Sequence, residues 1–168
     1  NFDVARLREV IAAGVPLASH QVQYSLIDRR PERGMVEFCA RHGIHLMSYG
    51  SLGGGFLSSR WLGRPAPEPP LANRSLVKYR LIIDEFGGWQ RFQTLLGELA
   101  EIASRHRVSV ANVAVRWVLD RPGVAAVIVG APDARHLEDN VAAFGVDLDD
   151  EDLDRLRPFE GAGPAGDV

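Results

Sequence analysis

The residues with the clearest potential for chemistry lie around a glycine-rich run that directly follows a tyrosine. Tyr49 precedes Gly50-Ser51-Leu52-Gly53-Gly54-Gly55, and glycine lets the backbone approach a phosphate closely with its N–H groups free to donate. A tyrosine ring offers a flat face to a planar ligand, and the amide of Gln21 both donates and accepts. Taken alone, these features are equally typical of a flexible loop, a core aromatic residue and a strand-end hydrogen bond.

Histidine and cysteine residues show no metal-binding pattern. His42, His45 and His106 have no ligand spacing with Cys39 or with a carboxylate cluster, so we expect surface or packing roles for them. His20 is expected to be structural. The single cysteine cannot form an internal disulfide, which predicts a small apolar side chain in a reducing compartment.

Three short segments predict the strands that would position these residues: Ser19–Leu26, Ile44–Tyr49 and Ala125–Val129. The last is apolar throughout, which is typical of a parallel strand buried on both faces. Hydrophobic periodicity predicts helices over residues 4–13, 32–42, 75–86, 90–106, 109–120, 133–143 and 149–157. Strands that alternate with helices predict βαβ units in a parallel sheet.

Two further segments stand out by composition. Residues 58–74 are rich in Pro, Gly and Arg and predict a long surface loop, whose Trp61 is a candidate to line a substrate pocket. The acidic run 147–154 predicts the solvated start of a helix, where the helix dipole favours negative charge.

The overall composition is that of a globular domain. The chain has 168 residues, 46% of them hydrophobic and 24% charged, with a net charge of −3. These values exclude disordered, collagen-like and coiled-coil classes, and no apolar run approaches the roughly 18 residues of a membrane helix. The mild acidic balance gives no attraction to nucleic acid or anionic lipid. With no secretory signal visible, we expect a cytoplasmic protein.

Four motifs in order give the sequence a specific resemblance to the aldo/keto reductases. They are Asn1-Phe2, His20-Gln21-Val22-Gln23-Tyr24-Ser25-Leu26, Ser48-Tyr49-Gly50-Ser51-Leu52-Gly53-Gly54-Gly55, and Val129-Gly130-Ala131 with Leu137-Glu138-Asp139-Asn140. They resemble the end of the family's Gly-x-Ser-Asn-Phe segment after the fifth strand, and then its sixth-, seventh- and eighth-strand motifs. Each motif alone is weak evidence, but four in the right order with matching helices between them form a specific signal.

The resemblance implies an α/β fold in which this chain is the C-terminal half of a (β/α)8 TIM barrel. Residues 1–160 would cover about strands 6 to 8 with their flanking helices, and residues 161–168 would form a flexible tail. Three strands cannot close a barrel that needs eight. We therefore expect the first half of the barrel to lie outside this sequence.

The resemblance also implies an NAD(P)-dependent oxidoreductase that transfers a hydride between C4 of a nicotinamide and a carbonyl or hydroxyl carbon. Ligands of such barrels lie at the C-terminal ends of the strands. There Asn1 and Gln21 would hold the carboxamide and Tyr49 would stack on the nicotinamide, while glycine backbone would hold the pyrophosphate. The implied cofactor-binding residues are Asn1, Gln21, Tyr49, Gly50, Ser51, Leu52, Gly54, Gly130, Ala131, His136, Asp139 and Asn140.

Two departures from the family pattern matter. Its catalytic Asp, Tyr, Lys and His belong to the first half of the barrel, so no catalytic residue is assigned in this chain. Positions that often hold Lys, Ser or Arg near the 2′-phosphate of NADPH are here Gly130, Ala131, Pro132 and His136. Without a fixed cation that phosphate loses charge-assisted partners. NADP is therefore only slightly favoured over NAD, with Arg135 as a nearby substitute.

A second class of function stays open, namely a non-catalytic module that binds nucleotide or works through partners. An open half-barrel exposes strand edges and helix flanks, which predicts a homo-oligomer or pairing with the missing N-terminal half. For the enzyme, the expected partner is a small carbonyl or sugar-like substrate, with neither nucleic acid nor membrane involved.

Overall fold

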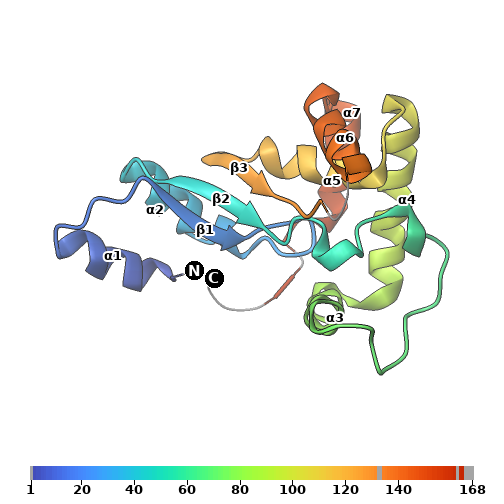
Figure 1. The fold of residues 1–168 in the computed structure, drawn as a ribbon, viewed down its shortest axis with the longest axis horizontal. Coiled ribbons are helices and arrows are strands. Elements are labelled where there is room, and N and C mark those ends of the chain that lie inside the picture. Colours follow the sequence, from blue (N-terminus) through green and yellow to red (C-terminus); the bar gives the residue numbers. More distant parts are fainter. Residues whose placement is uncertain (1, 132–133, 162, 165–168) are drawn as a thin grey trace.

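The structure is a computed structural model that describes residues 2–131, 134–161 and 163–164. Its centre is a parallel sheet of three strands in the order β1 (Ser19–Gln23), β2 (His45–Tyr49) and β3 (Val124–Ile128). In Figure 1 the strands point toward a group of helices beyond their C-terminal ends, while α1 and α2 lie alongside the sheet. The alternation of strands and helices predicted an α/β fold with a parallel sheet, and the structure confirms it.

The predicted helices are present with small shifts at their ends. They are α1 (Val4–Ala12), α2 (Met35–Arg41), α3 (Arg74–Phe86), α4 (Gly88–His106), α5 (Val110–Leu119), α6 (Ala134–Ala142) and α7 (Asp150–Leu156). Side chains cap four of their N-termini, those of Asp3, Asn73, Ser109 and Asp149. Each capping oxygen accepts from a backbone N–H that has no partner inside its helix, which fixes the start locally.

Helix α2 and strand β1 differ from their predicted bounds by three or more residues. Helix α2 begins at Met35 rather than Glu32 because Gly34 adopts a φ of +110°, which the helical backbone does not allow. Strand β1 ends at Gln23 because Ser25 and Asp28 pair with each other across a tight turn.

The two faces of the sheet have different surroundings. Gln21 pairs with Met47, and Gln23 pairs with Tyr49, which in turn pairs with Ile128. Because side chains alternate along a strand, these residues share one face. The other face carries His20, Val22, Leu46 and Ser48, which are all buried. His20 accordingly has a structural contact, with its Nε2 3.0 Å from the carbonyl oxygen of Phe2.

The prediction that the third strand is buried on both faces is wrong. Strand β3 is an edge strand of the described sheet, and Ala125 and Ile128 are exposed. An apolar sequence indicates that a strand can be buried on both faces. Whether it is buried depends on the elements that pack against it.

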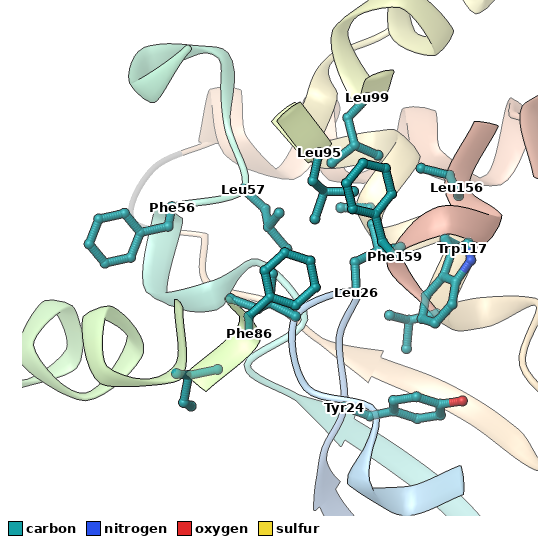
Figure 2. Close-up of a cluster of buried hydrophobic side chains, with 14 of the residues drawn as sticks. Tyr24, Leu26, Phe56, Leu57, Phe86, Leu95, Leu99, Trp117, Leu156 and Phe159 are labelled. Carbon is teal, nitrogen blue, oxygen red and sulfur yellow. The ribbon is translucent and has the colours of Figure 1, made fainter. Parts of the chain in front are cut away.

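The core lies where α3, α4 and α5 meet the C-terminal ends of the strands (Figure 2). Along α4, Phe92, Leu95, Leu96, Leu99 and Ile102 are fully buried and recur at helical spacing. Figure 2 shows Phe86, Leu95 and Phe159 brought together in this core. The rings of Phe86 and Phe159 are stacked with their centroids 6.3 Å apart.

The acidic run 147–154 is not fully solvated, contrary to the sequence prediction. Asp152 is completely buried and accepts from Arg105 Nη1 at 2.5 Å, and its other oxygen lies 2.6 Å from His106 Nε2. It also accepts from the backbone N–H of Asp149 at 3.2 Å in a reciprocal capping box. The run thus joins the start of α7 to the end of α4.

The C-terminal tail is described only in part. Of the predicted tail, residues 162 and 165–168 lie outside the described residues, and the carbonyl of Pro164 accepts from Arg33 Nη1 at 2.8 Å. Among the described helices, none combines the length and apolar character needed to cross a bilayer.

Candidate functional site

The C-terminal ends of β2 and β3 bring two distant segments of the chain together. Tyr49 and Ile128 end their strands as paired neighbours, so the glycine-rich run and the turn at Val129–Gly130 leave the sheet side by side. A cleft of about 440 Å³ lies between them and is lined by Gly50, Ser51, Leu52, Gly54, Gly55, Ser75, Tyr79, Ile128, Val129 and Gly130. Five predicted binding residues, Gly50, Ser51, Leu52, Gly54 and Gly130, therefore share one cleft.

Glycine is required at two positions of the run by conformation and by space. Gly50 and Gly54 have φ values of +68° and +64°, which residues with a side chain rarely adopt. A Cβ on Gly50 would overlap the Tyr79 hydroxyl, and one on Gly54 would lie 2.5 Å from Tyr79 Cδ2. The ring of Tyr79, from α3, thus packs directly against bare backbone.

Side chains on both sides hold the run in place. Ser51 is buried and its Oγ donates to the carbonyl of Tyr24 at 3.1 Å, so its hydroxyl has a structural partner. The indole N–H of Trp61 donates to the carbonyl of Gly55 at 3.1 Å, and its ring packs on Phe56 at a centroid distance of 4.9 Å. The sequence suggested Trp61 as a residue that lines a substrate pocket. Its contacts in the structure anchor the glycine-rich run.

Tyr49 lies half-buried on the shared face of the sheet, at the end of β2. Lys78 Nζ, from α3, is 5.4 Å from the centroid of its ring. Burial raises the pKa of the Tyr49 phenol, and the Asp28 carboxylate adds to this while Arg30 opposes it. The phenol is therefore neutral at physiological pH, and Tyr49 can offer a ligand the face of its ring.

A buried polar group beside Tyr49 was not anticipated from the sequence. Gln23 is 1% exposed and its Nε2 donates to Asp28 Oδ2 at 2.5 Å. Asp28 also accepts from Arg30 Nη2 at 2.6 Å and from Arg30 Nε at 2.8 Å. Gln23 Oε1 is buried and has no hydrogen-bond partner among the described residues. In the sequence, the charged residues Asp28, Arg29 and Arg30 shortly after the strand could have indicated this group.

Gln21 lies one pair further back on the same face of the sheet. It is exposed, and its Cα partner is Met47, whereas the residue level with Tyr49 is Gln23. Gln21 and Tyr49 thus share a face that opens toward the same end of the strands. The sequence analysis overlooked the second amide, that of Gln23, and the carboxamide role given to Gln21 stays a prediction.

The predicted residues after β3 form a separate group. Asn140 Nδ2 donates to the carbonyl of Gly130 at 3.3 Å. Asp139 accepts from Asn112 Nδ2 and Ser109 Oγ, both at 3.4 Å, so it faces the start of α5. Ala131 and Asn140 line a second, apolar cleft of about 330 Å³ between α5, β3 and α6. His136 is exposed on α6, and neither it nor Asp139 lines the glycine-rich cleft.

Some predicted positions cannot be placed. Asn1 and Pro132 lie outside the described residues, as does the side chain of Arg135. In the part of the chain that the structure covers, no group of three or more His, Cys, Asp or Glu side chains is arranged to hold a metal ion.

Comparison with known proteins gives a consistent result over nearly the whole chain. The model of the Aldo/keto reductase family matches residues 1–160. The chain is 36% identical over 142 residues to a chloroplastic pyridoxal reductase of Arabidopsis thaliana, covering 83% of this chain and 36% of that protein. It is 35% identical over 123 residues to flagellar radial spoke protein 5 of Chlamydomonas reinhardtii, covering 71% of this chain and 23% of that protein.

A solved structure resembles the chain in the same way. A thermostable aldo-keto reductase crystallised with the inhibitor epalrestat superposes with a TM-score of 0.66 at 27% identity, covering 95% of this chain and 46% of that one. The chain therefore spans less than half the length of these proteins.

Proposed function

Because the chain belongs to the aldo/keto reductase family, we propose that it is the cofactor-binding part of an NAD(P)-dependent oxidoreductase. The complete protein would transfer a hydride between the nicotinamide and a small carbonyl compound, or the corresponding alcohol. The observation that carries the proposal is the cleft in which Gly50, Ser51, Leu52 and Gly54 face Gly130.

The cleft has the features that a dinucleotide pyrophosphate needs. Its wall includes bare backbone at Gly50 and Gly54, where a Cβ would collide with Tyr79. Glycine backbone offers N–H groups that phosphate oxygens can approach closely. Ser51 would contribute through its backbone, since its hydroxyl already donates to Tyr24. The cleft lies directly beyond Tyr49, which favours one elongated ligand across both.

The neighbouring sheet face suits the nicotinamide. The Tyr49 ring would stack on it, and Gln21, with Asn1, would hydrogen-bond its carboxamide. Gln23 Oε1, which is buried and has no hydrogen-bond partner within the described part of the chain, adds a further acceptor at this end. Toward the adenosine end we propose Gly130, Ala131, His136, Asp139 and Asn140, with NADP as the cofactor and NAD as the other candidate.

This chain supplies orientation rather than the proton. The bound dinucleotide provides the hydride, and the carbonyl oxygen needs an acid whose pKa lies near neutrality. Burial raises the pKa of Tyr79 to about 12 and also raises that of Tyr49, which makes both poor acids at neutral pH. We therefore propose that residues 1–160 are the C-terminal half of the barrel and that the first half carries the acid. Residues 58–74 would form part of the substrate rim.

The location we propose is the cytoplasm. Cys39 is buried and burial raises the pKa of its thiol, so it behaves as an apolar side chain with little thiolate.

The test uses two glycines of positive φ, one inside the cleft and one outside it. Gly54 and Gly63 have φ values of +64° and +70°, but of these two only Gly54 lines the cleft and has Tyr79 and Ser75 in the way of a Cβ. We expect Gly54→Ala to weaken NADPH binding by about tenfold or more, equivalent to roughly 1.4 kcal/mol. Gly63→Ala controls for backbone strain and should bind nearly as the parent does. Tryptophan fluorescence titrated with NADPH and NADH measures both, and a parent chain that binds neither nucleotide would overturn the proposal.

The second candidate is an interaction module without activity of its own. The apolar residues exposed along α6 favour it, as does the similarity to a protein named for the flagellar radial spoke. Sedimentation of the purified chain distinguishes the two. Self-association without nucleotide affinity supports the module, whereas nucleotide affinity supports the oxidoreductase, as a homo-oligomer or paired with an N-terminal half.

A further inference from the structure

One cation stands directly at the aromatic ring of the proposed nicotinamide site. Lys78 Nζ lies 5.4 Å from the ring centroid of Tyr49 and 5.2 Å from that of Tyr79. Both distances are within the range of a cation–π contact. Lys78 does not line the glycine-rich cleft, so its charge lies at the tyrosine end of the site rather than among the phosphate-binding groups.

The other charges near Tyr49 compensate each other. Arg30 is held by Asp28 through two hydrogen bonds of 2.6 and 2.8 Å, and Asp28 is completely buried. Lys78 forms no ion pair within the described residues, and its two ring contacts are its only interactions there. Glu85, exposed on α3, also acts on Arg30 through its charge, whereas the Lys78 ammonium contacts the Tyr49 ring itself.

We propose that Lys78 makes the site distinguish the two redox forms of the cofactor, so that reduced nicotinamide binds more tightly relative to oxidised nicotinamide than it would without this cation. The inference rests on the proposed function, in which Tyr49 stacks on the nicotinamide. The oxidised ring carries a positive charge that the reduced ring lacks, while the pyrophosphate and adenosine are the same in both forms. A fixed cation next to the ring therefore repels one form only.

The consequence is a bias in the direction of turnover. A site that retains the reduced form and releases the oxidised form favours reduction of a carbonyl over oxidation of an alcohol. Because Lys78 is exposed, solvent and salt screen the repulsion, and we expect about a three- to tenfold difference in the affinity ratio.

The experiment measures this ratio of dissociation constants, oxidised over reduced, for NADP⁺ and NADPH. Lys78→Gln removes the charge and should lower the ratio by about three- to tenfold, whereas Lys78→Arg should preserve it. Arg41→Gln is the matched control, because it removes one exposed positive charge on α2 that forms a surface pair with Glu37. Raising the salt concentration should lower the ratio of the parent and leave that of Lys78→Gln nearly unchanged.

The outcomes separate the two proposals. If Lys78→Gln weakens both redox forms by the same factor, the ammonium acts on the phosphates and the redox inference is overturned while the binding function stands. The same holds if neither affinity changes. If the parent chain binds neither form, the proposed function fails, and this inference fails with it.

Discussion

Two regions of the molecule carry apolar side chains that differ in burial. In the helical end, where α3, α4, α5 and α7 lie, most such side chains are buried, whereas in the α6 flank (Leu137, Val141 and Phe144) they are exposed. Phe92 and Leu95 on α4 are completely buried, whereas Leu137, Val141 and Phe144 on and after α6 are 59%, 56% and 70% exposed. The flank also borders an apolar cleft beside the edge strand β3. The side chains of the α6 flank are as suited to burial as those of the core. The two regions differ in burial because other elements of the described chain cover the apolar side chains of the core but leave those of the flank exposed. We take this as support for the proposed pairing of this flank with further protein.

Two buried polar side chains differ between the helical end and the strand ends. At the helical end Asp152 is completely buried, and Arg105, His106 and the backbone N–H of Asp149 lie within hydrogen-bond distance of its carboxylate. At the strand ends Gln23 Oε1 is buried without a hydrogen-bond partner among the described residues. The contrast belongs to these two side chains and not to the regions as a whole, because Arg91 Nε and Arg155 Nε at the helical end are also buried without a hydrogen-bond partner among the described residues.

The sharpest test of the comparison removes one phenylalanine from each region. Phe92→Ala leaves a cavity among Phe56, Trp89 and the α4 residues that surround it, and should lower the free energy of unfolding by about 3–5 kcal/mol. Phe144→Ala removes a ring that is 70% exposed and should change it by no more than about 0.5 kcal/mol. Urea unfolding followed by circular dichroism measures both.

Equal losses for the two variants would break the comparison. They would mean that Phe144 is already buried in solution, by self-association of the chain. The dependence of the transition on protein concentration would then identify that association.

The next prediction concerns the buried carboxylate of the helical end. Asp152→Asn keeps the volume but removes the charge that Arg105 and His106 share. Because Arg105 is partly exposed and can rehydrate, we expect a loss of about 2 kcal/mol rather than the full cost of an isolated buried charge. Asp154→Asn, on the exposed side of α7, breaks only a surface pair with Arg157 and should cost less than about 0.5 kcal/mol. Similar effects of the two substitutions would show that Asp152 is not buried in solution.

Local signals explain what the sequence predicted well. The starts of α1 and α5, predicted to within one residue, depend on the capping side chains of Asp3 and Ser109, which lie within three residues of the N–H groups they accept from. The meeting of the glycine-rich run with Gly130 follows from parallel strands that end at one edge. Both were therefore accessible without coordinates.

Long-range packing explains what was missed. Tyr79 and Ser75 come from α3, which begins at Arg74, well beyond the end of the glycine-rich run at Gly55, and carries no motif that directs it there. The burial of Asp152 depends on Arg105 and His106, whose positions are set by how α4 packs on α7. The burial of Gln23 likewise depends on how the turn at Asp28 folds back over the end of the strand.

The smallest effect we predict is in the titration of the three tyrosines, which lie at the junction of the two regions. Burial is the largest cause of a raised pKa for each: Tyr24, whose hydroxyl also donates to Glu32 at 2.7 Å, Tyr49, and Tyr79 at about 12. The folded chain therefore keeps these protons above the ordinary value of 10.0, whereas the unfolded chain loses them there. Folded-state stability is complete below that pH and falls as the pH rises toward 12.

The ultraviolet absorbance of tyrosinate tests this against a sample unfolded in urea. We expect the unfolded chain to titrate all three tyrosines near the ordinary value and the folded chain to titrate none of them there. Tyr79→Phe should remove the component near pH 12. Because the charge of a Tyr49 phenolate also raises the pKa of Tyr79, Tyr49→Phe should move that component to a lower pH. Tyr24 packs at the helical end, whereas Tyr79 lines the cleft. If Tyr79 has an ordinary pKa while the pKa of Tyr24 stays raised, water reaches the floor of the cleft. In that case the part of the site that is open to water would extend to α3.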